Sequence, residues 1–109
     1  MIALVVRFDV RDEQSAVHFD QLTTDVVARI ATEEPGTRVY ATHAIRDEPL
    51  ARVFYEVYAD EAAFSAHEHA DHVVDFHARK APLLAREPRV EFLSPGPARG
   101  AASGPRLGE

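Results

Sequence analysis

The residue whose type and position point most directly to chemistry is Glu56, a carboxylic acid inside an apolar segment. Its neighbours in residues 54–58 are all aromatic or β-branched. Burying an ionised carboxylate costs several kcal/mol unless the group is paired or hydrogen-bonded, so Glu56 requires a partner. His67 and His72 follow it closely, and a neutral histidine can take a phenolic proton as a general base. The sequence therefore predicts His67, His72 and Glu56 as catalytic residues. The alternative is a structural acid, with histidines that pack or cap helices.

Aromatic side chains near this acid could line a pocket for a small aromatic substrate. Tyr55, Phe64 and Phe76 come from the predicted strand and from the two helical segments that follow it. His43 falls on an apolar face of the preceding predicted strand. We interpret Tyr55, Phe64, Phe76 and His43 as substrate-binding residues. The alternative for each is ordinary core packing.

Histidines in residues 67–77 also raise the question of a metal site, because imidazole and carboxylate are common ligands. On an ideal helix with 3.6 residues per turn, however, His67 and His72 lie about 140° apart. Only a break in the helix near residue 70 would bring them together. We therefore predict no metal, and we expect His69 and His77 to be exposed to solvent.

Hydrophobic periodicity gives the elements that must position these residues. The predicted order is a strand at 2–10, a helix at 13–33, strands at 37–46 and 51–58 joined by a hairpin turn at 47–50, a short helix capped by Asp60, a helical run from about Asp71, and a strand at 89–93. This βαββαβ order predicts an α+β, ferredoxin-like antiparallel sheet with helices on one face. We expect one domain over residues 1–94 and a disordered tail rich in Pro, Gly and Ala over 95–109.

Composition excludes several classes of function. The chain has 109 residues, which is enough for one core. Its formal net charge is −6, from 18 acidic and 12 basic residues, so we expect no nucleic-acid partner. Cysteine is absent, which excludes thiolate chemistry. The first residues match neither a signal peptide nor a membrane span, so we expect a cytoplasmic protein with no membrane partner.

Three strings occur in a characteristic order: Glu34-Pro35-Gly36, then E-x-Y-x-D-x-x-A-F-x-x-H from Glu56 to His67, then H-x-x-x-F from His72 to Phe76. Over roughly residues 1 to 93 the sequence resembles the antibiotic biosynthesis monooxygenase (ABM) family, which includes quinol monooxygenases. The resemblance implies a homodimer in which two sheets pack face to face as a dimeric α+β barrel. Apolar residues on both faces of the predicted strands 2–8 and 51–58 agree with such a second layer.

The resemblance also implies a cofactor-independent monooxygenase that oxidises a small quinol or phenolic metabolite with dioxygen. No nucleotide-binding glycine loop is present, in agreement with a protein that uses no cofactor. Haem-degrading relatives depend on Asn and Trp, and this chain contains neither. The alternative is a non-redox dimeric barrel protein, either an isomerase of a small oxygenated metabolite or a small-molecule binding module.

Overall fold

The computed structural model describes residues 1–100, and the elements follow the predicted order. They are β1 (Ile2–Asp9), α1 (Glu13–Glu33), β2 (Thr37–Ile45), β3 (Glu48–Tyr58), α2 (Glu61–His69), α3 (Asp71–Lys80), a 3₁₀ turn η1 (Ala81–Leu83) and β4 (Arg89–Leu93). Pro82 lies in η1, where α3 gives way to the tighter turn. The prediction of a ferredoxin-like α+β fold is confirmed.

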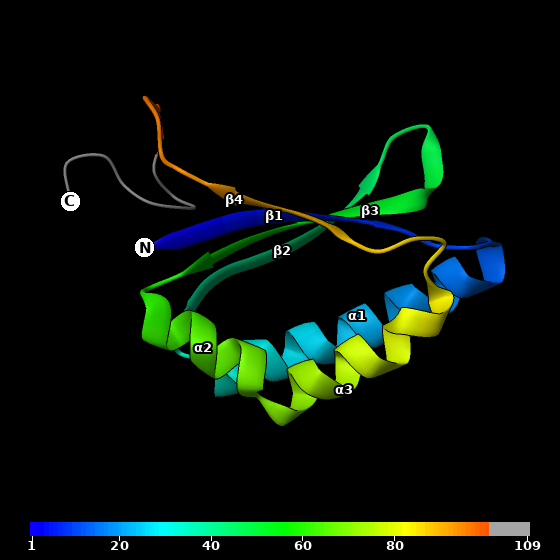
Figure 1. Cartoon of the computed structure of the whole chain (residues 1–109), viewed down its shortest axis with the longest axis horizontal. Coiled ribbons are helices and arrows are strands. Elements are labelled where there is room, and N and C mark those ends of the chain that lie inside the picture. The colour runs from blue at the N-terminus through cyan, green and yellow to red at the C-terminus, as the bar shows by residue number, and fades with distance from the viewer. Residues whose placement is uncertain (101–109) are drawn as a thin grey trace.

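The four strands form one antiparallel sheet in the order β2-β3-β1-β4. All helices cover the same face of this sheet (Figure 1). In the register, Leu4 of β1 pairs with Glu56 of β3 on one side and with Phe92 of β4 on the other. Paired residues point to the same face of a sheet, so Glu56 points toward the helices.

Side-chain caps begin the first two helices. Asp12 accepts a hydrogen bond from the Ser15 amide at 2.7 Å, and Asp60 accepts one from the Ala63 amide at 2.8 Å. Such caps satisfy amides that have no partner inside the helix. The cap at Asp60 was predicted, and it places α2 directly after β3.

The turn between β2 and β3 differs from the predicted position. Ile45 pairs with Glu48 across the hairpin, so the turn is Arg46-Asp47 rather than residues 47–50. Asp47 has a positive φ of 65°, a conformation that aspartate tolerates in tight turns. The prediction relied on Pro49, which instead lies near the start of β3.

Aromatic rings fill the core between the sheet and the helices. Phe8 and Phe54 from the sheet lie 4.7 Å apart between ring centroids, and Phe19 of α1 lies 5.3 Å from Phe8. Phe54 and Phe76 stack at 6.4 Å. These rings anchor α1 and α3, so the helices hold a fixed position over the sheet.

The sheet face away from the helices carries Val5, Val53 and Tyr55, which are only partly buried. Residues 95–100, the start of the predicted tail, are exposed and contain no helix or strand, and the rest of that tail (101–109) lies outside the described residues. No helix in residues 1–100 is long and apolar enough to cross a membrane.

Candidate active site

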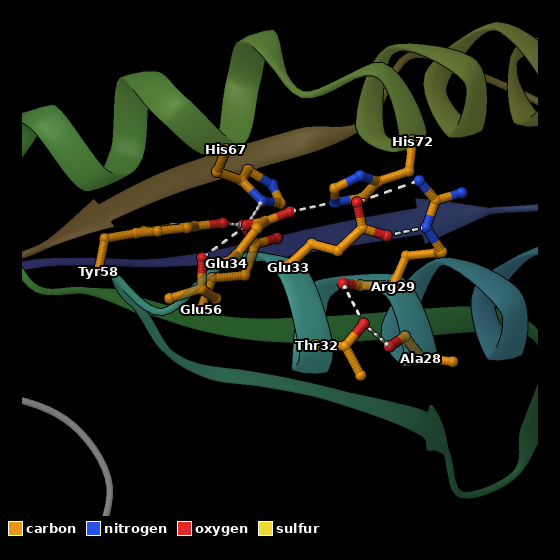
Figure 2. Close-up of polar contacts among 10 residues, drawn as sticks. Ala28, Arg29, Thr32, Glu33, Glu34, Glu56, Tyr58, His67 and His72 are labelled. Atoms are coloured by element: carbon orange, nitrogen blue, oxygen red, sulfur yellow. Dashed lines mark hydrogen bonds and ion pairs between the residues drawn. The ribbon is translucent and has the colours of Figure 1, made fainter.

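Glu34 holds both histidines of the motif strings, His67 and His72, through its two carboxylate oxygens (Figure 2). His67 donates from Nδ1 to Oε1 at 2.7 Å, and His72 donates from Nε2 to Oε2 at 2.5 Å. Thr37 adds a third hydrogen bond from its hydroxyl to Oε1 at 2.7 Å. The three ionisable side chains are each at most 7% exposed. Glu34 thus joins the two histidines into one buried unit.

A break between two helices makes this convergence possible. Ala70 separates α2 from α3 with an extended ψ of 136°, so His67 and His72 do not share one continuous helix. His67 comes from the last turn of α2 and His72 from the first turn of α3. Glu34 reaches them because α1 ends immediately before it.

Gly36 brings α2 close to this end of α1. A Cβ atom at Gly36 would lie 2.5 Å from the Cβ of Ala63, far inside van der Waals contact. The Gly36 carbonyl also accepts a hydrogen bond from the Ala59 amide at 2.9 Å. The Glu34-Pro35-Gly36 string therefore supplies both the carboxylate and the space in which α2 can approach it.

Glu34 is held as a carboxylate. Burial acts to raise the pKa of Glu34, but the hydrogen bonds from Thr37, His67 and His72 together lower it by more. The net pKa is therefore below the ordinary value of 4.5. The acceptor fixes His67 with its proton on Nδ1. Among the described residues no hydrogen bond uses Nε2 of His67, which leaves that atom as a base.

A cavity of about 320 Å³ lies between the sheet and the α2–α3 segment. Its polar lining consists of Tyr40, Glu56, His67, Glu68, His77 and Lys80. Apolar side chains of β1 and β4 line the remainder, together with Phe64 and the segment after α3. A mostly apolar cavity with a few converging polar groups is the usual form of a small-molecule site.

Glu56 and Tyr58 form a second polar pair beside His67. Tyr58 donates a hydrogen bond to Oε1 of Glu56 at 2.5 Å. Burial raises the pKa of Glu56, although the bond from Tyr58 opposes the shift. Burial and the neighbouring Glu56 raise the pKa of Tyr58, so its hydroxyl stays protonated. The rings of Tyr40 and Tyr58 lie 5.4 and 5.0 Å from the His67 imidazole and fix its plane.

The structure brings three of the predicted site residues to the cavity: His67, Glu56 and Phe64. His72 does not line this cavity. It is connected to the cavity only through Glu34, which also bonds His67. Phe76 is buried in the core beside it. The remaining two predicted residues lie elsewhere.

Tyr55 pairs with Val5 and points to the sheet face away from the helices. His43 is exposed on β2, where its Nδ1 atom contacts the Val53 carbonyl at 3.1 Å. Neither side chain reaches the cavity from its own face of the sheet. Successive residues of a strand point to opposite faces of the sheet, so Tyr55 and its neighbour Glu56 cannot face the same cavity. This alternation alone would have excluded Tyr55 from the site.

Sequence reasoning missed Glu34 and Lys80 as site residues, and it considered Tyr40 as a possible pocket residue without selecting it. Glu34 was noticed only as part of a motif string. Tyr40 pairs with Glu56 across β2 and β3, a register that the misplaced hairpin turn obscured. His69 and His77 are exposed, as expected. Within residues 1–100, no cluster of three or more His, Asp or Glu side chains is arranged to hold a metal ion.

The comparisons with known proteins identify the family and support the fold. The sequence profile described as antibiotic biosynthesis monooxygenase matches residues 1–79. A Caulobacter crescentus structure named for that family is 26% identical, with a TM-score of 0.82 over 88% of this chain and 90% of that chain. A Nitrosomonas europaea structure so named is 20% identical, with a TM-score of 0.80 over 87% and 98%.

A Deinococcus radiodurans structure of the same name is 17% identical, with a TM-score of 0.76 over 93% of this chain and 98% of that chain. No curated protein matches the sequence. The family profile covers well over half of the chain, and the solved structures share its fold. The chain belongs to the antibiotic biosynthesis monooxygenase family.

Proposed function

We propose that this protein is a cofactor-independent monooxygenase that oxidises a small quinol or phenolic metabolite with dioxygen. The observation that carries the proposal is the Glu34–His67 pair at the wall of an apolar cavity. Glu34 fixes the proton of His67 on Nδ1, so Nε2 can accept the phenolic proton of a substrate. His67 is then the catalytic base and His72 a positioning residue that acts through Glu34.

Deprotonation makes the aromatic ring electron-rich enough to reduce dioxygen. One oxygen atom is added to the ring and the other leaves as water, and the substrate supplies all the electrons. The protein's contribution is to exclude water, orient the ring and stabilise the anion. Phe64 offers an apolar wall, and the protonated Tyr40 hydroxyl is available at the same cavity.

Oxygen consumption with a panel of quinols and polyphenols tests the proposal, with and without a chelator. Uptake that survives chelation supports it. His67→Ala should lower the turnover rate by about 10²–10⁴-fold, the usual contribution of a general base. His72→Ala should cause a smaller loss, because it removes only a support of Glu34.

His69→Ala is the matched control, since His69 is exposed and bonds only within its own helix. Its rate should equal that of the parent protein. Wild-type rates in both the His67 and His72 variants would refute base catalysis at this site. If no member of the panel is consumed, the protein belongs instead with the non-redox alternative, an isomerase or a binding module.

We also propose that the protein is a cytoplasmic homodimer in which the helix-free faces of two sheets pack against each other. Val53 and Tyr55 on that face are only partly buried, and Leu93 at its edge is 44% exposed. Closing such a face against a second copy removes apolar area from water. Sedimentation equilibrium at micromolar concentration should give the mass of a dimer, and a stable monomer would overturn this assembly.

A further inference from the structure

The cavity contains the only lysine of the chain. Of the 12 basic residues, Lys80 alone is a lysine, and the others are arginines. Lys80 is the last residue of α3 and is only 5% exposed. Its ammonium group lies 4.4 Å from the ring centroid of Phe8 and 4.7 Å from that of Phe76. A lysine is almost never buried in this way without a partner.

No carboxylate pairs with Lys80 among the described residues. Arg7, Arg29 and Arg52 each contact a carboxylate directly, but no ion pair within residues 1–100 includes Lys80. Its hydrogen bond goes to Nδ1 of His77 at 2.7 Å. The positive charge therefore lies beside the cavity without an anion in contact.

His77 accepts this hydrogen bond as a neutral imidazole. His77 is 45% exposed, but desolvation of the part of its ring that faces the cavity, together with the neighbouring charge of Lys80, lowers its pKa to about 4. Burial lowers the pKa of Lys80 itself to about 8, which leaves the ammonium form dominant at neutral pH. The imidazole thus orients the ammonium group but does not neutralise it.

The other titratable groups that face the cavity do not replace a bound anion. Glu56 from β3 and Glu68 from α2 act on Lys80 through longer-range charge interactions and form no ion pair with it, and burial raises the pKa of Glu56. Tyr40 from β2 stays protonated. The remaining wall around the ammonium group is apolar, and there a charge interaction is stronger than in water.

We propose that Lys80 is the anion-binding residue of this cavity, and that its ligand is a small aromatic molecule carrying an anionic oxygen, either a carboxylate or a phenolate. The ring of the ligand packs near Phe64 and Phe92, which meet edge to face at 5.8 Å on the cavity wall. This inference rests on the proposed function only for the choice of cavity. It concerns binding and requires no oxidation.

Calorimetry with naphthoate and its neutral analogue naphthamide tests the charge directly. The wild-type protein should bind naphthoate at least about tenfold more tightly than naphthamide, which corresponds to one favourable charge contact. Lys80→Met should remove this preference, and Lys80→Arg should keep part of it. Arg79→Met, which removes an exposed charge on the same helix, is the matched control and should keep the full preference.

Equal affinity for the two probes in the wild-type protein, failure of both to bind, or a preference that survives in Lys80→Met would each overturn the proposal. A nitrophenol, which ionises near neutral pH while Lys80 is still an ammonium group, distinguishes the two anion sources. Tight nitrophenol binding that increases as the phenol ionises assigns a phenolate ligand, and weak nitrophenol binding beside tight naphthoate binding assigns a carboxylate.

A second measurement uses the wild-type protein and does not depend on whether Lys80→Met folds. Because the chain has one lysine, protein labelled at the lysine ε-carbon gives a single side-chain NMR signal. Naphthoate should raise the titration midpoint of that signal, because an anion stabilises the ammonium form, and naphthamide should not. An unchanged midpoint with bound naphthoate would refute the contact. Oxygen uptake tests the proposed function separately, so either idea can fail alone.

Discussion

Replacement of Glu34 by glutamine tests whether this carboxylate is the support of the site. The carboxylate accepts hydrogen bonds from Thr37, His67 and His72. A glutamine of the same shape offers one accepting oxygen and one NH₂ group, which cannot accept from an imidazole N–H. In the variant, one buried histidine therefore either loses its acceptor or changes tautomer so that its ring nitrogen accepts from the NH₂ group.

The size of the effect follows from this loss. Leaving a buried donor without an acceptor costs about 1–3 kcal/mol, and hydrogen bonds to charged groups lie toward the upper part of that range. For a domain of this length, each kcal/mol shifts the melting temperature by roughly 4–8 °C. We therefore expect Glu34→Gln to lower the Tm by roughly 8–24 °C and to slow turnover, because His67 is no longer held in one tautomer.

The pH dependence gives a second signature. The pKa of Glu34 is lowered in the folded protein, so its stabilising contribution is present above the ordinary glutamate pKa of 4.5 and is lost as the pH falls through the folded value. The stability difference between the parent protein and Glu34→Gln should therefore shrink on acidification below that range. Denaturant unfolding at several pH values measures this difference.

Glu33→Gln is the matched control, since Glu33 is the preceding residue and pairs with Arg29 on the exposed surface of α1. Its melting temperature should be nearly unchanged. If Glu34→Gln melts and turns over like the parent protein, or if Glu33→Gln is equally destabilised, then the buried acceptor is not what organises the site.

Three further changes probe the surrounding structure. Gly36→Ala should destabilise the fold by about 1–3 kcal/mol through overpacking against Ala63, and Ala63→Gly in the same chain should restore part of the loss; no rescue would refute the steric explanation. Tyr58→Phe should cost more stability at about pH 8 than at about pH 5, because it removes the hydrogen bond that lowers the already raised pKa of Glu56; an equal cost at both values would contradict that account. Truncation after Ser94 should leave the Tm nearly unchanged, since the following residues 95–100 are exposed; a large drop would show that the removed segment docks on the domain.

Local patterns were sufficient to predict most of the fold. The alternation in β1, the stripe of apolar residues in α1 and the cap at Asp60 all depend on near neighbours in the sequence. The hairpin turn was misplaced because a proline at position 49 is a stronger turn signal than Asp47, whose left-handed backbone is visible only in the structure. The turn propensity of single residues is a weaker determinant of the hairpin than the pairing register of the two strands.

The candidate site was only partly predictable, because its decisive contacts join distant parts of the chain. His67 and His72 are separated from Glu34 by 33 and 38 residues in the sequence, and no local sequence pattern indicates that they come together in space. On one continuous helix the two histidines would lie about 140° apart, and the sequence analysis recognised that a break near residue 70 was needed to bring them together but could not identify the group that they share. Once the break at Ala70 is known, one carboxylate can hold both.

The same break explains why the two histidines have different roles in our proposal, although the motif presents them alike. At the end of α2, His67 bonds Glu34 through Nδ1, and it also lines the cavity. At the start of α3, His72 bonds the same carboxylate through Nε2, its outermost ring nitrogen, and lies outside the cavity. Of the two imidazoles, only His67 has a ring that lines the apolar cavity beside Glu56 and Lys80. Our proposal therefore makes His67 the base, because Glu34 holds its proton on Nδ1 at the wall of that cavity, and it makes His72 a positioning residue because His72 reaches the cavity only through the shared carboxylate and His67.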